Sequence, residues 1–242
     1  MKKKMKKAKK IISLIILFLF LIPLFSCSSS ETVELSDTKT QDNLTYYIYH
    51  DTISDSYYAK TYEYNGSSSL VTILDTLEYN NIDVPVTEVL SSTFVGNNNV
   101  EKIVIGSNIE KIEERSFMSL KSLKEVVLND KLTKLSDYLF SRSTIKSIVL
   151  PENITKICDA AFLRSSLESI TILNNTIEIG QEVFLHCDSL TCVYFKGTQE
   201  EFSSLKMSYG NDLFKNATLY LYSEEYQSGC WHFVDNTPTL WA

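Results

Sequence analysis

The sequence has few of the residues that enzyme motifs require. Its 242 residues include only three histidines, and it contains no glycine-rich phosphate loop, His-Glu-x-x-His motif or nucleophile elbow. Ser203-Ser204-Leu205-Lys206 fits the Ser-x-x-Lys pattern of serine acyl-enzymes, but the companion motifs Ser-Asp-Asn and Lys-Thr-Gly are missing. A serine hydrolase is therefore the weakest functional hypothesis, and the sequence predicts a protein that is not an enzyme and uses no cofactor.

Positive charge is scarce outside the N-terminus. Seven of the 23 basic residues are lysines within residues 1–10, and residues 11–26 carry no charge. The remaining chain has 16 basic and 30 acidic residues. Such an acidic surface repels nucleic acid and anionic lipid headgroups, so neither is an expected ligand.

Cysteines are few and irregularly placed. Four follow Cys27, and these are Cys158, Cys187, Cys192 and Cys230. The spacing of Cys187 and Cys192 beside His186 fits no common zinc pattern, so no metal site is expected. In an exported protein the four cysteines could pair in any of three ways or remain unpaired, and the sequence leaves these alternatives open.

The N-terminus is typical of an export signal. A lysine-rich start leads into an apolar run from Ile11 to Phe25, and small residues begin at Ser26. Fifteen residues span only about 22 Å as a helix, less than the roughly 30 Å of a bilayer's hydrocarbon core, so an export signal is favoured over a membrane-spanning anchor. Removal of residues 1–26 is the expected result.

Leu24-Phe25-Ser26-Cys27 resembles the lipobox of bacterial lipoproteins, which implies that Cys27 becomes lipidated. The alternative is a plain secretory signal followed by an incidental cysteine. The segment after Cys27 is polar and lacks periodicity, so residues 27–43 are predicted to form a flexible tether.

The middle of the chain repeats. Phenylalanines stand at positions 94, 117, 140, 162 and 184, spaced 23, 23, 22 and 22 residues apart. An aliphatic pair precedes each one, and an apolar triplet follows it, as in Ile145, Ile148 and Leu150. The last two triplet positions alternate, so they point to one face of a short strand. Because a unit this short cannot bury its own apolar face, stacked copies are expected to pool their phenylalanines into one core.

These units resemble the BspA-type leucine-rich repeat over about residues 70–195. The resemblance implies a mainly β solenoid of 22–23 residue repeats, with a parallel sheet, short turns or helical turns, and β-rich caps. It also implies a bacterial surface protein that binds other proteins, and the family motif contains no catalytic residue. The expected divisions are an N-terminal β cap and partial repeat over residues 44–85, repeats over 86–195, and a C-terminal cap over 196–242.

Strand residues that point away from this core form the candidate binding site. Contiguous exposed apolar residues often mark an interaction surface, although β-branched residues also simply favour strands. The candidate residues are Val104, Val127, Val149, Thr171 and Tyr194 in one column, with Lys102 and Glu125 beside them.

These observations predict a lipid-anchored protein on the outer face of the bacterial cell membrane or cell surface. Its expected partner is a protein, either an extracellular host protein bound in adhesion or an envelope protein. The alternative is a structural lipoprotein that organises the envelope by binding a partner of the same cell.

Overall fold

The structure, a computed structural model, describes residues 32–241. The predicted export signal over residues 1–26 and the predicted lipidation of Cys27 therefore lie outside the described residues. Within the described part, no helix is both long and apolar enough to cross a membrane.

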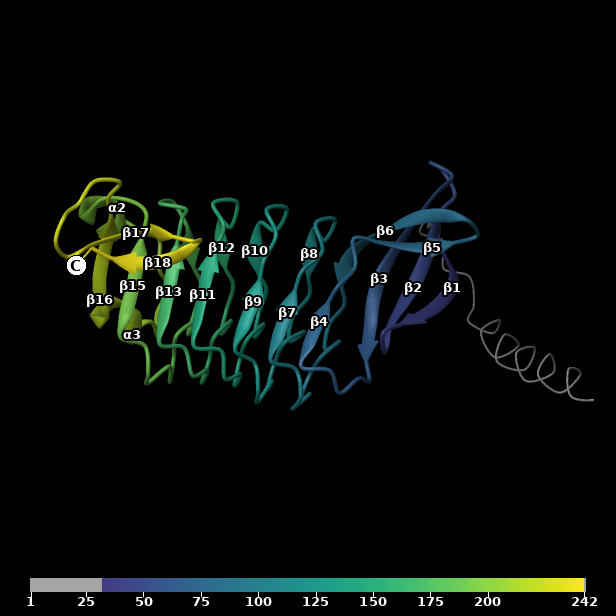
Figure 1. The fold of residues 1–242 in the computed structure, drawn as a ribbon, viewed down its shortest axis with the longest axis horizontal. Helices are drawn as coiled ribbons and strands as arrows, with labels where there is room; N and C mark the ends of the chain where they lie inside the picture. The colour runs from purple at the N-terminus through teal and green to yellow at the C-terminus, as the bar shows by residue number, and fades with distance from the viewer. Residues whose placement is uncertain (1–31, 242) are drawn as a thin grey trace, which may run out of the picture. The chain divides into compact units, whose positions relative to one another are not determined.

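The repeats coil into a solenoid in which each turn adds a strand to a front ladder (Figure 1). The front strands are parallel, and equivalent residues of successive turns stand side by side. They are β4 (Leu70–Thr72), β7 (Lys102–Val104), β9 (Glu125–Val127), β11 (Ser147–Leu150), β13 (Ser169–Ile172), β15 (Cys192–Phe195) and β16 (Thr218–Tyr222). Pairing runs through β4, β7 and β9, and again from β11 to β16, while β9 and β11 contact each other without joining one sheet. The predicted mainly β solenoid with a parallel sheet is confirmed.

A second, shorter ladder lies behind the first. Its strands are β6 (Ile82–Val89), β8 (Lys111–Ile112), β10 (Lys134–Leu135), β12 (Lys156–Ile157) and β14 (Glu178–Ile179). β6 pairs with β8, and β10, β12 and β14 form a three-stranded parallel sheet. In each two-residue strand of this ladder, only one residue faces inward. In β12, for example, Ile157 is buried and Lys156 is exposed. Two residues per turn are therefore enough to close the core.

The phenylalanines form one buried column between the two ladders. All five are at most 1% exposed, and the ring centroids of neighbours lie 5.3–5.7 Å apart. Tyr64 extends the column at its N-terminal end, and Phe214 extends it at the other. Each ring fills the space above the previous one, so the expected pooled core is confirmed.

The turns that carry the phenylalanines use left-handed backbone conformations. In all five, the residues two before and two after the phenylalanine have positive φ angles, such as Tyr138 (55°) and Arg142 (59°) around Phe140. Gly96 is the one glycine at these positions. Left-handed geometry costs other residues roughly 1–2 kcal/mol each. Hydrogen bonds to the next turn offset this cost, as where the Arg142 N–H donates to the Leu163 carbonyl at 2.9 Å.

The repeat pattern continues past residue 195, where the sequence was expected to enter its C-terminal cap. The strand β16 pairs in parallel with β15, and the Phe214 ring stacks 4.7 Å from Phe184. The two phenylalanines are 30 residues apart because this turn is longer than the others. Its extra length holds the short helices α2 (Gln199–Ser203) and α3 (Asp212–Asn216).

A mixed, mostly antiparallel sheet covers the N-terminal end of the solenoid. Its order is β1 (Val33–Gln41), β2 (Leu44–Asp51), β3 (Ser56–Tyr64), β6 and β5 (Thr76–Tyr79). The pair β3 and β6 is parallel and joins this sheet to the back ladder. Inward side chains of β2, including Tyr46 and Ile48, continue the core of the repeats.

The prediction of a flexible tether over residues 27–43 is wrong for residues 33–41, which form β1. This strand pairs with β2 from Val33 opposite Asp51 to Gln41 opposite Leu44, with one register shift between Leu35 and Asp37. Its residues are nearly all exposed, so it needs no apolar alternation. Positive φ angles at Asp42 and Asn43 make the tight two-residue turn that favours a hairpin. Residues 27–31 lie outside the described residues.

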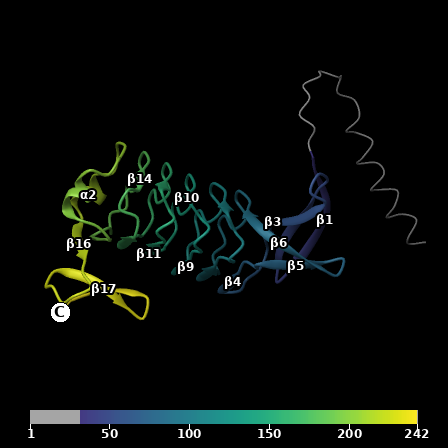
Figure 2. The same ribbon diagram turned by 90° about the horizontal axis from the view of Figure 1, so that it is seen from above.

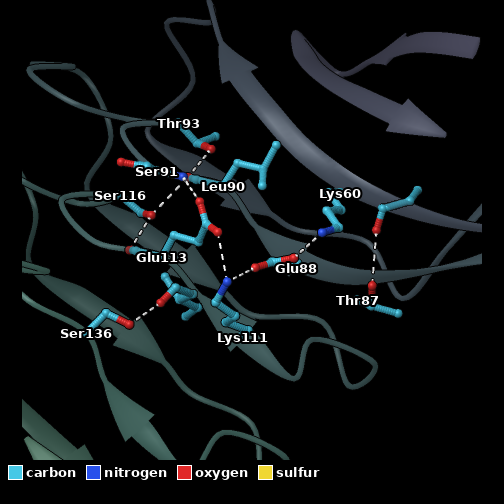
Figure 3. A network of polar contacts seen from close by, with 12 residues as sticks. Lys60, Thr87, Glu88, Leu90, Ser91, Thr93, Lys111, Glu113, Ser116 and Ser136 are labelled. Carbon is cyan, nitrogen blue, oxygen red and sulfur yellow. Dashed lines mark hydrogen bonds and ion pairs between the residues drawn. The ribbon is translucent and has the colours of Figure 1, made fainter. Parts of the chain in front are cut away.

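A buried carboxylate joins the N-terminal sheet to the repeats (Figure 3). Glu88 of β6 is 7% exposed and lies between two ammonium groups, Lys60 of β3 at 2.6 Å and Lys111 of β8. Lys111 also contacts Glu113 at 2.8 Å, and these hydrogen bonds raise the pKa of Lys111. Burial lowers the pKa of Lys60, but the hydrogen bond and charge of Glu88 outweigh burial and raise it overall. Both lysines therefore stay protonated beside Glu88.

Replacing Phe140 with alanine should reduce the free energy of unfolding by roughly 3–5 kcal/mol, because it opens a cavity between two stacked rings. Denaturant unfolding followed by circular dichroism measures this loss. Tyr209→Ala is the control, since that ring is 64% exposed. A loss below about 1 kcal/mol in Phe140→Ala would show that the column is not a packed core.

Glu88→Gln should destabilise the protein by roughly 2 kcal/mol, less than the 3–5 kcal/mol of a fully buried pair because Lys60 and Lys111 reach water. Thermal unfolding at neutral pH measures the change. Glu178→Gln is the matched control, since Glu178 holds the equivalent position in β14 but pairs with Lys206 at the surface. Equal shifts of Tm in the two variants would contradict a special role for the buried site.

Candidate ligand-binding surface

The structure gathers the predicted surface residues into two columns on the front ladder. Val104 stands beside Val127, and Val149 stands beside Thr171, which in turn neighbours Tyr194. Lys102 and Glu125 lie next to this column and form an ion pair at 2.8 Å. The residues between them, such as Ile103 and Val126, are buried. The strands thus turn the predicted residues away from the core, as the period of two requires.

The column is open at one end and covered at the other. Val127 is 41% exposed, and Val104 and Val149 are half-buried. Thr171, by contrast, is only 3% exposed, and Tyr194 is half-buried against other aromatic rings. The predicted face therefore presents its valines, while its threonine is closed to a ligand.

A C-terminal hairpin covers this end of the front ladder. It consists of β17 (Cys230–Val234) and β18 (Thr237–Leu240), joined by Asp235 and Asn236 with φ angles of 49° and 60°. β17 begins beside β16, and the hairpin then runs back across the ladder toward β11 (Figure 1). Figure 2 shows it on the opposite side of the strand row from α2.

Trp231 fastens the hairpin to the sheet. It is fully buried, and its indole N–H donates a hydrogen bond to the Phe195 carbonyl at 3.2 Å. Its ring meets those of Tyr194 and Tyr222 edge-on, with centroids 6.0 and 5.0 Å away. The hairpin is thereby held by one large aromatic anchor packed on the outward side of the repeats.

A groove remains where the hairpin tip faces the open valines. Its volume is about 790 Å³, within the range of pockets that bind ligands. Val127 and Val149 lie on the ladder side, and Thr237 and Pro238 lie on the hairpin side. The repeats alone do not make this cavity, because one of its walls comes from the C-terminal hairpin.

The charged residues that line the groove are all acidic. They are Glu125, Asp130, Glu152 and Asp235. Two of these negative charges are paired with lysines outside the groove, since Lys102 pairs with Glu125 and Lys196 pairs with Glu152 at 2.5 Å. The carboxylates of Asp130 and Asp235 form no ion pair with any residue in the described range 32–241. The groove is therefore an apolar floor with a negatively charged rim.

The residues considered for catalysis do not face one another. The Ser203 hydroxyl donates to the Gln199 carbonyl at 2.8 Å. Lys206 pairs with Glu178, and this hydrogen bond raises the pKa of Lys206. A general base needs the opposite shift, so the arrangement does not fit the serine–lysine pattern.

The four cysteines of the described region are free thiols. Cys187 is buried, where burial raises the pKa of its thiol, and its Sγ donates to the Phe162 carbonyl at 2.9 Å. In residues 32–241, no three histidine, cysteine or carboxylate side chains come together as metal ligands would. The alternative that the thiols stay unpaired is the one that the structure shows.

The reasoning from sequence missed the hairpin and, with it, Asp130, Asp235 and Pro238. A signal was present, since Asp-Asn between two short alternating segments favours a two-residue hairpin turn. Nothing local to the sequence, however, indicates that this hairpin returns to strands some 90 residues earlier.

Trp231→Ala should release the hairpin from the front ladder. We expect amide hydrogen exchange to accelerate in β17 and β18, because local opening exposes backbone that the anchor now protects, while β11 keeps its protection. Tyr209→Ala serves as the control, since Tyr209 is 64% exposed. Unchanged exchange in Trp231→Ala would mean that other contacts hold the hairpin.

Comparison with known proteins places these features in a family. Residues 87–218 match the model of the BspA type leucine rich repeat region, in six copies. The match extends to the first residue of β16, so it includes the long turn that carries Phe214. No curated protein matches the sequence.

Solved structures of leucine-rich repeat proteins align with this chain at low sequence identity. A leucine rich cell surface protein from Faecalibacterium prausnitzii aligns with a TM-score of 0.55 and 20% identity, over 73% of this chain and 43% of that one. The leucine rich repeat protein of T. pallidum aligns with a TM-score of 0.48 and 18% identity, over 69% and 70% of the two chains. This chain thus spans less than half the length of the first of these proteins. Its own repeats and the family match lead to one conclusion: the chain belongs to the BspA-type leucine-rich repeat family.

Proposed function

We propose that this chain is an exported, lipid-anchored protein that binds another protein through the open part of its front ladder. The observation that carries the proposal is the groove over Val127 and Val149, a hollow with an apolar floor at the edge of the covered sheet. Contiguous exposed apolar surface often marks an interaction site, and repeat solenoids provide extended binding surfaces.

The contrast between the two halves of the ladder supports this proposal. The same outward column is buried at Thr171 and left open at Val127. Export and lipidation rest on the N-terminal sequence, which begins with lysines and ends its apolar run at Cys27. A protein displayed outside the cell meets extracellular partners, so adhesion to a host protein is the preferred role.

The experiment is binding of the full-length chain, in mild detergent, to an array of extracellular host proteins and to the envelope proteins of the producing cell. Val127→Ser/Val149→Ser should weaken a saturable interaction at least about tenfold, because the loss of each buried valine side chain reduces the binding free energy by roughly 1 kcal/mol or more. Surface plasmon resonance measures the Kd.

The matched control is Val33→Ser/Val95→Ser, because these two valines are 37% and 42% exposed but lie away from the groove. It should bind like the unmodified chain, and both double variants should keep their Tm. Binding to host proteins supports adhesion, and binding only to envelope proteins supports an envelope-organising role. Equal binding by the two double variants would refute the proposed surface.

A further inference from the structure

The shape of the groove favours a short extended segment over a flat protein surface. It is bounded by two separate parts of the chain, the front ladder around β9 and β11 and the hairpin tip at residues 235–238. A volume of about 790 Å³ between two walls is large enough for several side chains but too small to enclose a folded domain. A partner would therefore insert a single stretch of chain.

The floor of the groove determines which side chains suit the centre of the bound segment. Val127 and Val149 are rigid, branched side chains, and Pro151 and Pro238 add apolar surface that cannot rearrange. Such a floor gains most from apolar side chains of the partner, through removal of apolar surface from water. The partner's central residues are thus expected to be valine, isoleucine or similar.

The acidic rim of the groove determines which side chains suit the two ends of the bound segment. Asp130 on the ladder side and Asp235 at the hairpin tip have no cationic partner among the described residues. The groove lining includes no lysine, arginine or histidine that would balance them. A charge-assisted hydrogen bond to a carboxylate is about twice as strong as a neutral one, so lysine or arginine side chains flanking the apolar centre would complement both walls.

Recognition here depends on side chains more than on strand addition. β18 and β11 are the two edge strands of their sheet, and β18, on the hairpin side of the groove, would normally offer a free backbone edge. Pro238 occupies the middle of this strand and has no N–H to donate. An inserted segment would therefore gain its specificity from the valines and the two aspartates.

We infer that the groove between the front ladder and the C-terminal hairpin binds an extended, cationic segment of a partner protein, with apolar residues at its centre and lysine or arginine on its flanks. This inference rests on the proposed function, because it names the chemistry of the partner for the same surface. The acidic character of the whole chain adds to it by steering cations toward the groove.

Three fluorescein-labelled peptides of equal length test the inference on the full-length chain in mild detergent. The first alternates valine and threonine between terminal lysines, the second replaces the lysines with glutamates, and the third replaces the valines with serines. Fluorescence anisotropy at low and at physiological salt should show the first peptide binding at least about tenfold more tightly than either of the others, with an affinity that falls as salt rises.

Asp130→Asn/Asp235→Asn should weaken binding of the lysine peptide roughly tenfold and flatten its salt dependence. Asp83→Asn/Asp188→Asn is the matched control, since both of these aspartates are exposed and outside the groove, and it should change neither. Equal affinity of the lysine and glutamate peptides, or equal losses in the two double variants, would overturn the inference.

The two proposals fail differently. If an array partner depends on Val127 and Val149 but is unaffected by Asp130→Asn/Asp235→Asn, the binding surface stands and the cationic segment is wrong. If the lysine peptide binds and no array protein does, the chemistry of the groove stands and the proposed class of partner is wrong.

Discussion

Every turn of this protein depends on the next one for its backbone hydrogen bonds and for the burial of its phenylalanine. The left-handed residues around Phe140 are tolerable only because their N–H groups donate to the following turn. The Phe140 ring is buried only because Phe117 and Phe162 cover its two faces. A single repeat would leave both needs unmet, so the protein exists as a stack that must be closed at both ends. Tyr64 closes one end of the aromatic column, and Phe214 closes the other.

The parts of the fold that recur were the parts that sequence could predict. Five repetitions of the phenylalanine and of triplets such as Ile145, Ile148 and Leu150 identified the core, and the alternation within each triplet separated inward from outward residues. Structures that occur once gave no such signal. The strand β1 is polar because neither of its faces is buried, and its pairing is set by the turn at Asp42 and Asn43. The last turn was assigned to the cap, because α2 and α3 lengthen it and break the spacing of 22–23 residues.

The candidate surface shows the same division. The register of the repeats was enough to align Val127 and Val149 on one face, since each occupies the same place in its strand. Whether a position in that column is open depends on the hairpin, which comes from the far end of the chain and is anchored by Trp231. The acidic rim likewise combines Asp130 with Asp235, over a hundred residues apart. Contacts of this kind are decided by packing, and local pattern does not encode them.

The missing pairing between β9 and β11 has a mechanical consequence. Val127 and Val149 lie on opposite sides of this seam, so the floor of the groove spans the one place in the described front ladder where neighbouring strands belong to different sheets. If the solenoid is pulled along its axis, ladder hydrogen bonds resist separation of the other front strands, while the two turns at the seam are joined by hydrogen bonds at their phenylalanine turns, as where the Phe117 N–H donates to the Leu139 carbonyl at 3.2 Å. A ligand bound across both valines would connect the two sheets at this seam and stiffen it. Occupied and empty molecules would then differ in stiffness even where their structures are the same.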